Sequence, residues 1–497
     1  MARRTMSDTQ TPKQWKTLDK DLKRISRVEQ ATAYVARPLI TPGIALAFMV
    51  LAGIAASVLF GGVNGNLIVV AAAVFGAYMA INIGANDVAN NMGPAVGANA
   101  LTMGGAIAIA AVAESAGALL AGGDVVSTIS KGIIDPTSVA NAEVFIWAMM
   151  AALISSALWV NLATWVGAPV STTHSVVGGV MGAGIAAAGL SAVDWGTMGK
   201  IAASWVISPV LGGVIAAGFL ALIKAKIIYV EDKIAASRRW VPILVAIMAG
   251  AFATYLAIKG FKRIIKIDLQ VALAIGLAAG VAVWAVTVPL IRKQSEGLEN
   301  RTKSIKTLFG LPLVISAGLL SFAHGANDVA NAVGPLAAIV HATEFGDFAA
   351  KVSIPSWVMI IGAFGISFGL FLFGPKLIRM VGSQITKLNP MRAYCVALSA
   401  AITVIVASWL GLPVSSTHIA VGGVFGVGFF REWHSDRRRR NSNKHRPPEK
   451  RLAPEERQRR KLVRRSHFMT VIAAWVITVP AAAIMSGLIF LLLNAIV

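Results

Sequence analysis

Two short polar segments of this sequence each occur twice, in the same order along the chain. Gly84–Asn90 reads GANDVAN and recurs unchanged as Gly325–Asn331, and Pro169–His174 reads PVSTTH and returns as PVSSTH at Pro413–His418. Chance does not plausibly produce two matched pairs of this kind. Because internal repetition determines the architecture of a chain before any local motif does, the sequence indicates two related halves.

The first repeated segment offers oxygen ligands of the kind that bind a small, hard cation. Each copy carries a central aspartate, Asp87 or Asp328, flanked by asparagines. Carboxylate and amide oxygens are the ligands that such cations prefer. The alternative is a helix-capping Asp/Asn pair buried for packing, but two identical copies at equivalent places argue against it. With Glu114 as a third carboxylate in an apolar segment, the predicted cation-binding residues are Asn86, Asp87, Asn90, Glu114, Asn327, Asp328 and Asn331.

The second repeated segment places hydroxyl side chains at a predicted helix start. In both copies proline precedes the hydroxyls and a glycine-rich run follows them. Hydroxyls and free backbone N–H groups at a helix start form a site for an oxyanion, although either copy alone would be interpreted as a helix N-cap. As a pair beside two aspartates, they favour anion binding with a cation for compensation. The predicted anion ligands are Ser171, Thr172, Thr173, Ser415, Ser416 and Thr417.

Three further residues have more than one interpretation. His174 and His418 close the two copies of the hydroxyl segment, and each could bond the anion, relay protons or hold the hairpin in place. We weigh the structural role at least as heavily for both. Lys131 could anchor a loop or contact a substrate, and we favour the loop anchor.

The chain that must position these groups has the composition of a membrane protein. Of its 497 residues, 56% are apolar and 14% are charged, whereas soluble proteins carry roughly 25% charged residues. Segments such as 44–60 and 271–286 are apolar on all sides, which excludes the alternating pattern of a β-barrel. The single cysteine, Cys395, excludes an intrachain disulfide, and the sequence has no Cys/His cluster for structural zinc. The predicted fold class is an all-α polytopic membrane protein.

Apolar stretches of about 20 residues, the length that crosses a bilayer, predict about 12 to 13 transmembrane helices. They begin near residues 43, 66, 101, 140, 168, 199, 240, 270, 308, 356, 393, 413 and 470. Lys and Arg produce a net charge of +22 and gather in residues 1–37, 224–239, 292–306, 376–392 and 431–466. Basic loops remain cytoplasmic, and an alternating path places all five segments on that side. One loop, Lys259–Lys266 with four basic residues, conflicts with this assignment.

The basic segments have no interleaved aromatic residues and no RNA-binding module pattern, so nucleic acid is not the expected partner. The loop around residues 437–465 is better explained as a cytoplasmic segment attracted to anionic lipid. The expected partners are therefore the lipid bilayer and the transported ions.

On this topology the two halves are antiparallel, because the helices that enter the two GANDVAN segments cross the membrane in opposite directions. Inverted repeats that meet near the midplane, with broken helices at the site, are typical of secondary transporters. We expect a break at each of the four segments, buried in protein or lining a water-filled cavity. The predicted parts are a basic cytoplasmic tail (1–37), a first repeat with an extra N-terminal helix (38–222), connecting helices and loops (223–306), a second repeat (307–430), a basic cytoplasmic loop (431–466) and a C-terminal helix (467–497).

Together with the KGIID stretch at Lys131–Asp135, the duplicated segments resemble the inorganic phosphate transporter (Pit) family of symporters. The resemblance covers most of residues 66–430 and the final helix. It implies import of inorganic phosphate with Na⁺ or H⁺, about twelve helices with re-entrant hairpins, a homodimer and a multi-pass location in the inner (plasma) membrane. It also implies that Asn86, Asp87, Asn327 and Asp328 form the coupling-ion cluster and that the six hydroxyls of residues 171–173 and 415–417 form the phosphate-binding tips.

The sequence departs from the family pattern in two places. A spanning segment at 43–61, after the basic tail, precedes the usual first helix. Ala397 stands where sodium-coupled animal members carry a helix glutamate, which leaves the coupling ion open.

Other classes of protein fit these residues less well. Sulfate is the second choice of substrate, because a sulfate permease of the same fold would use the same hairpin site. Aspartyl intramembrane proteases carry a GxGD pattern, which neither aspartate motif has. A hydrolase that used Ser171 and His174 would lack the GxS turn of such enzymes. An ion channel would not require two polar breaks of each type. We therefore expect no enzymatic activity, no cofactor and no metal beyond the transported cation.

Overall fold

The computed structural model describes residues 39–60, 66–135, 138–166, 170–260, 267–346, 354–384, 388–443 and 465–496. The predicted N-terminal tail, most of the predicted cytoplasmic loop at 431–466 and residues 261–266 of the conflicting basic loop lie outside this part of the chain. The described residues divide into two units by their internal contacts, 39–48 and 49–496. The first described helix, Leu39–Leu59, begins in one unit and ends in the other.

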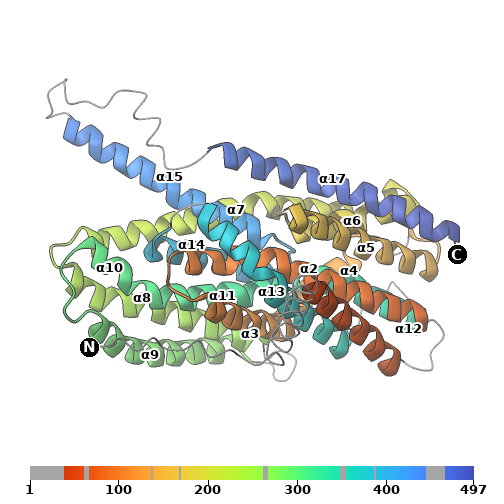
Figure 1. The fold of residues 1–497 in the computed structure, drawn as a ribbon, viewed down its shortest axis with the longest axis horizontal. Coiled ribbons are helices and arrows are strands. Elements are labelled where there is room, and N and C mark those ends of the chain that lie inside the picture. The colour runs from red at the N-terminus through yellow and green to blue at the C-terminus, as the bar shows by residue number, and fades with distance from the viewer. Residues whose placement is uncertain are drawn as a thin grey trace, which may run out of the picture. The chain divides into compact units, whose positions relative to one another are not determined.

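The described residues are helical almost throughout, and an isolated bridge between Ile134 and Val193 is their only β-type pairing. The first half contains α2 (Asn66–Gly97), α3 (Met103–Ala121), α4 (Gly123–Lys131), α5 (Ala142–Val166), α6 (Thr172–Ala188) and α7 (Trp195–Ile223) (Figure 1). The connecting part contains α8 (Lys233–Tyr255), α9 (Leu269–Gln294) and α10 (Thr302–Leu308). The second half contains α11 (Gly310–Asp328), α12 (Ala330–Phe345), α13 (Ser356–Gln384), α14 (Pro390–Trp409), α15 (Ser416–Asn443) and α17 (Arg465–Ile496).

Eleven helices in the described ranges are long and apolar enough to cross a membrane. They correspond to the predicted stretches except those beginning near residues 168 and 413. These two stretches are α6 and α15, which follow the hydroxyl segments. Helix α6 is only 17 residues long, and the second half of α15 is strongly charged, so neither has the length and composition of a complete crossing. The all-α polytopic fold is confirmed, with eleven candidate spans in the described residues.

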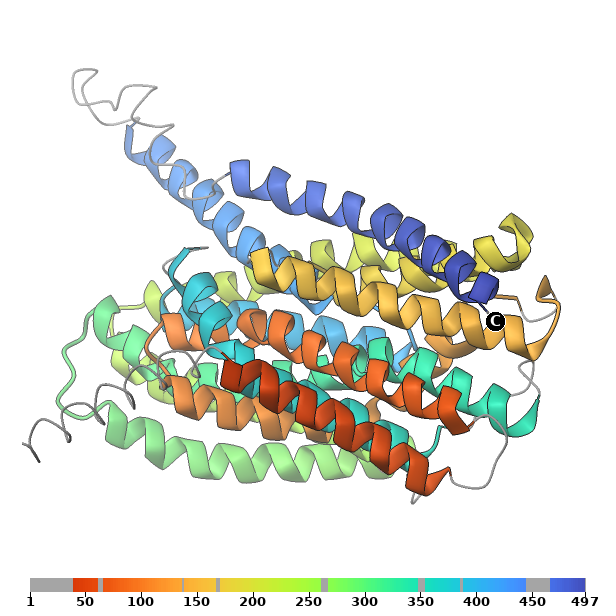
Figure 2. The same ribbon diagram turned by 45° about the vertical axis from the view of Figure 1, so that its right-hand side comes forward.

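The two halves exchange helices with each other. Helix α2 of the first half packs against α13 of the second, and α11 of the second packs against α3 of the first. The C-terminal helix α17 packs against α6, while α15 packs against α7, so the exchange is reciprocal (Figure 2). Each half therefore depends on the other for its packing, as expected of paired repeats that meet around a common site.

Glycine begins both GANDVAN segments because another helix crosses there at very short range. A Cβ atom at Gly84 would lie 1.8 Å from the carbonyl oxygen of Ile366 on α13. A Cβ atom at Gly325 would lie 2.1 Å from the carbonyl oxygen of Glu114 on α3. Only glycine permits these approaches. The repeated glycine thus fixes each motif at a crossing between the halves.

The prediction of a broken helix at the first GANDVAN segment is wrong. Helix α2 runs without interruption from Asn66 to Gly97 through Asp87. In the second copy, α11 ends at Asp328 and α12 begins at Ala330. The backbone of α2 stays helical because the motif's Asn86, Asp87 and Asn90 side chains bond to other elements rather than to their own turn. The chain does leave the helix at the hydroxyl segments, between α5 and α6 and between α14 and α15.

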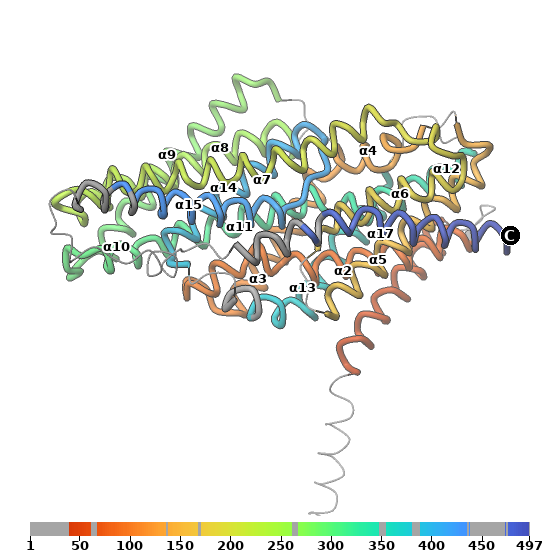
Figure 3. Tube along the Cα trace, turned by 90° about the horizontal axis from the view of Figure 1, so that it is seen from above, coloured from red at the N-terminus to blue at the C-terminus, as the bar shows by residue number. Residues whose placement is uncertain are grey.

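Three of the predicted basic segments, 224–239, 292–306 and the described start of 431–466, meet at one end of the helices. The Tyr229 hydroxyl lies 2.7 Å from Nε2 of His434, and the Asn300 side chain donates to the Glu231 carbonyl at 2.8 Å. The end of α15 and α10 both lie at the left-hand end of the helices in Figure 1, while α4 and α12 lie towards the other end (Figure 3). Lys259, the first residue of the conflicting loop, forms an ion pair with Asp124. Its charge is therefore locally compensated.

The positive-inside rule then predicts which loops face the cytoplasm. In a Cys395→Ala background, Glu296→Cys should react with a membrane-impermeant thiol reagent only after cells are permeabilised. Ser191→Cys should react in intact cells, because its loop lies at the opposite end of α7 from the basic loop at 224–239. Both native side chains are exposed. Labelling of both cysteines in intact cells would contradict this topology.

Candidate functional site

All four repeated segments converge on one buried cluster. The cluster is formed by the middle of α2, the end of α11 and the first residues of α6 and α15. Asp87 and Asp328 are each 1% exposed, and every predicted cation, anion or relay residue is buried. The structure thus joins the two predicted sets of ligands in a single site.

Each aspartate accepts hydrogen bonds from both hairpins, of which the first is formed by α5 and α6 and the second by α14 and α15. Asp87 accepts a hydrogen bond from the Thr172 hydroxyl of its own half at 2.9 Å. It accepts a second from the Thr417 hydroxyl of the other half, also at 2.9 Å. Asp328 accepts a hydrogen bond from the Ser416 hydroxyl of its own half at 3.0 Å and another from the Thr173 hydroxyl of the other half at 3.3 Å. The two arrangements are related by the exchange of halves. Each carboxylate therefore connects the two repeats.

The motif asparagines extend this symmetry into the hairpin arms. Asn90 donates to the Thr417 hydroxyl at 2.8 Å, and Asn331 donates to the Thr173 hydroxyl at 3.2 Å. The other two asparagines hold the hairpin arms: Asn86 donates to Thr164 at 3.0 Å, and Asn327 donates to Ser408 at 2.9 Å. These amides orient the hairpins whose hydroxyls bind the aspartates.

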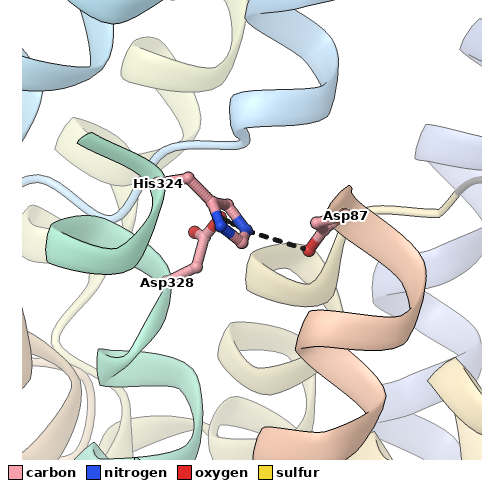
Figure 4. A group of neighbouring side chains, drawn as sticks. All are labelled: Asp87, His324 and Asp328. Atoms are coloured by element: carbon pink, nitrogen blue, oxygen red, sulfur yellow. Dashed lines mark ion pairs between the residues drawn. The ribbon is translucent and has the colours of Figure 1, made fainter. Parts of the chain in front are cut away.

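His324 is a central member of the cluster that sequence reasoning missed. Its side chain lies between those of Asp87 and Asp328 (Figure 4). Its Nε2 atom is 2.9 Å from an oxygen of Asp328 and 3.6 Å from one of Asp87. Its Nδ1 atom lies 3.2 Å from an oxygen of Glu114, which also accepts from Asn91 at 3.0 Å. The signal was an ionisable residue within an apolar span, directly before the motif glycine. The corresponding residue of the first half is Ile83, so the symmetry is broken here.

The cluster carries an excess of negative charge. Its three carboxylates form ion pairs only with His324 in the described part of the chain. In their ionised forms these three groups would place three negative charges against at most one positive charge at buried positions. Buried charge of this kind is costly unless it is paired. One ligand atom each from Asp87, His324 and Asp328 can lie within 4.8 Å of the others, close enough to hold a cation together.

Ser171 and Ser415 have a different place from the other four hydroxyls. The Ser171 hydroxyl accepts from the His174 backbone N–H at 3.1 Å, and the Ser415 hydroxyl accepts from that of His418 at 3.3 Å. Both serines therefore act as helix N-caps, the alternative that the sequence left open. A capping hydroxyl still has a proton to donate.

The two repeated histidines face each other between the hairpins rather than the carboxylates. The ring centroids of His174 and His418 are 4.5 Å apart, and His174 also lies edge-on to Trp205 at 3.8 Å. Trp205 donates its indole N–H to the Pro413 carbonyl at 3.1 Å. This placement supports a structural role in joining the hairpins.

Comparison with known proteins agrees with this arrangement. The model of the Phosphate transporter family matches residues 83–486, which include all four repeated segments. A Helicobacter pylori (strain J99) protein named "Putative phosphate permease" is 52% identical over 418 residues, covering 83% of this chain and 78% of that protein. The chloroplastic inorganic phosphate transporter 2-1 of Arabidopsis thaliana is 36% identical over 448 residues, covering 84% and 71% respectively.

A solved structure is also similar. It is described as the sodium-dependent phosphate transporter, is 34% identical and superposes with a TM-score of 0.78, covering 87% of this chain and all of that one. The matched region includes both halves and their shared cluster, and the family match extends over most of the chain. This chain belongs to the Phosphate transporter family.

Proposed function

We propose that the protein imports inorganic phosphate by symport with a cation, at the cluster where the hairpins meet. The observation that carries this proposal is the sharing of both aspartates by both hairpins. Any ion that changes the charge of Asp87 or Asp328 also changes the hydroxyls that face the anion. Cation binding and anion binding are therefore linked through the same hydrogen bonds.

The excess negative charge explains why the anion requires a cation. Phosphate carries one or two negative charges near neutral pH, and it would join a cluster in which three carboxylates face one histidine. Their repulsion in a buried site is large. A cation held by Asp87 and Asp328 offsets this repulsion, so the two ions bind more favourably together than separately.

The hydrogen-bond directions favour phosphate over sulfate. Thr172 and Ser416 donate their only hydroxyl proton to an aspartate, so towards a substrate their oxygens act as acceptors. Phosphate near neutral pH carries at least one P–OH group that can donate to them, whereas sulfate carries none. The N–H groups at the starts of α6 and α15 supply donors for the unprotonated oxygens.

Two cations remain candidates for coupling, each favoured by a different observation. The similar solved structure is described as sodium-dependent, and the carboxylate, hydroxyl and amide oxygens of the cluster suit sodium. The contact of His324 with three carboxylates favours a proton instead, because imidazole takes up a proton near neutral pH. We propose sodium as the coupling ion and the proton as the second candidate.

Uptake by purified protein in proteoliposomes tests the proposed function. An inward sodium gradient should drive accumulation of labelled phosphate, and an equal potassium gradient should not. Excess sulfate should compete weakly because it cannot donate to the hydroxyls. Accumulation driven by a proton gradient without sodium would select the second cation. No phosphate accumulation under either gradient would refute the proposal.

The wider assembly follows from the same proposal. A chain with eleven candidate spans in its described part is a multi-pass membrane protein. We propose the plasma membrane as its location, since phosphate import serves the cell at that boundary. We also propose a homodimer as its assembly, which the resemblance to the Pit family implies. The alternatives of an intramembrane protease or hydrolase have no support among the matched family, whose members are transporters.

A further inference from the structure

A polar cavity lies beside the second hairpin, separate from the carboxylate cluster. Its volume is about 510 Å³, and it opens between the end of α4, the first turns of α7 and the turn that follows α14. One wall of the cavity is formed by α4 and α7, and the opposite wall is formed by residues 410–412. The polar side chains of the first wall are Ser127, Thr128, Lys131, Thr197 and Lys200.

The charged residues that line this cavity are both lysines. Lys131 has no ion pair with any described residue, and Lys200 is exposed. Of the nearby carboxylates, Asp124 pairs with Lys259. Asp194 caps α7 by accepting from the Thr197 N–H at 2.9 Å and from the Thr197 hydroxyl at 3.0 Å, and it offsets part of the charge of Lys200 without forming an ion pair with it. A cleft lined by one sign of charge raises the local concentration of ions of the opposite sign.

The hairpin wall of the cavity is hydrogen-bonded directly to the cluster. The Thr128 hydroxyl donates to the Gly411 carbonyl at 2.7 Å from the cavity side. The next carbonyl, of Leu412, accepts from the Asn327 side chain at 3.1 Å on the other side. Asn327 is adjacent to Asp328. Gly411 has φ +68, a left-handed conformation that glycine adopts without strain. Two consecutive residues thus separate the cavity from the cluster.

The cavity lies at the end of the helices opposite the basic loops. Helix α4 lies at the opposite end from α10 in Figures 1 and 3. The positive-inside rule places that end outside the cell, where lysines are less frequent in the loops. Two lysines in one cleft on this face, and hydroxyls beside them, suit a small oxyanion.

We propose that this cavity is the outer vestibule in which inorganic phosphate binds before it passes the second hairpin. Lys131 and Lys200 attract the anion, and the hydroxyl of Ser127 replaces part of its water. The prediction that Lys131 only anchors a loop is replaced by this role. The inference rests on the proposed function, because it assigns an entry route to the same substrate.

Replacement of both lysines in the full-length protein tests the vestibule. The double variant Lys131→Gln/Lys200→Gln should raise the KM for phosphate about fivefold to tenfold at low ionic strength, with little change in maximal rate. High salt should bring the wild-type KM close to that of the variant, because a Debye length of about 3 Å at 1 M salt screens the lysines. Lys131→Arg/Lys200→Arg should restore the low KM. Lys303→Gln, an exposed lysine of α10 on the opposite face, is the matched control and should behave as wild type.

The outcomes separate this inference from the function on which it rests. If wild-type protein accumulates phosphate and the Gln double variant has an unchanged KM, the vestibule is wrong and the proposed function stands. A loss of maximal rate at constant KM would also refute the vestibule. If wild-type protein accumulates no phosphate, the proposed function fails and the vestibule fails with it.

Discussion

Asp328→Asn is expected to abolish phosphate uptake while the protein still reaches the membrane. The Asp328 carboxylate accepts hydrogen bonds from the hydroxyls of Ser416 and Thr173, and one of its oxygens lies 2.9 Å from Nε2 of His324. Hydrogen bonds to a charged group contribute about 1.5–3 kcal/mol each. Two weakened bonds correspond to a loss of about a hundredfold or more, since about 1.4 kcal/mol is a factor of ten. Asp87→Asn should have a similar effect, because Asp87 holds the equivalent pair of hydroxyls.

Insertion of these variants should remain normal, since an aspartate is more costly than an asparagine inside the bilayer. The measurement is sodium-driven phosphate uptake, normalised to folded protein by size-exclusion chromatography. Asp232→Asn is the matched control. Asp232 caps α8 by accepting from the Ala235 N–H at 2.9 Å, and asparagine caps a helix equally well. Wild-type uptake in both cluster variants would eliminate the proposed role of the carboxylates.

The sequence was sufficient to place the repeated motifs in one site because each motif carried its own signal. Two identical aspartate segments and two matched hydroxyl segments in the same order predict a paired site. The structure confirms the two repeats and brings the predicted residues together. Sequence could not predict that Thr173 bonds to Asp328 and Thr417 to Asp87. That exchange depends on how one half packs against the other, which no local pattern records.

The features that sequence reasoning missed lack a counterpart in the other half. His324 has Ile83 at the equivalent position, so repetition gave no indication of its role. Lys131 was singled out in the sequence with a substrate contact as its second interpretation, but the cavity that it lines is formed only when α4, α7 and the second hairpin come together. The helix break predicted at Asp87 failed for a related reason, because hydroxyls from two other elements bind the aspartate and leave the backbone of α2 helical. Local sequence shows which groups need partners, and only the tertiary fold shows where the partners come from.

Thr173→Val and Thr417→Val should each reduce uptake about tenfold or more, and their effects should be strongly non-additive. Each substitution removes a hydroxyl that joins the hairpin of one half to the aspartate of the other. Thr417→Val also leaves the Asn90 amide without its acceptor. Thr173→Val removes one of the three acceptors of the Asn331 amide, which also donates to Thr172 and Asp328. Valine keeps the β-branched shape of threonine and lacks only its hydroxyl, so the loss reports mainly on the hydrogen bonds.

The non-additivity follows from the reciprocal arrangement. The two cross-half bonds close the same contact between the hairpins, so loss of either one opens it. The second substitution then removes little further, and the double variant should resemble the more severe single variant. Uptake rates of the wild type, both singles and the double form a double-mutant cycle. Independent sites add within about 0.3–0.5 kcal/mol, and the combination of Thr173→Val with Asp232→Asn supplies that reference. If the two threonine effects add as closely as this reference pair, the hairpins do not act as one unit at the aspartates, and the shared site at the centre of the proposed mechanism is wrong.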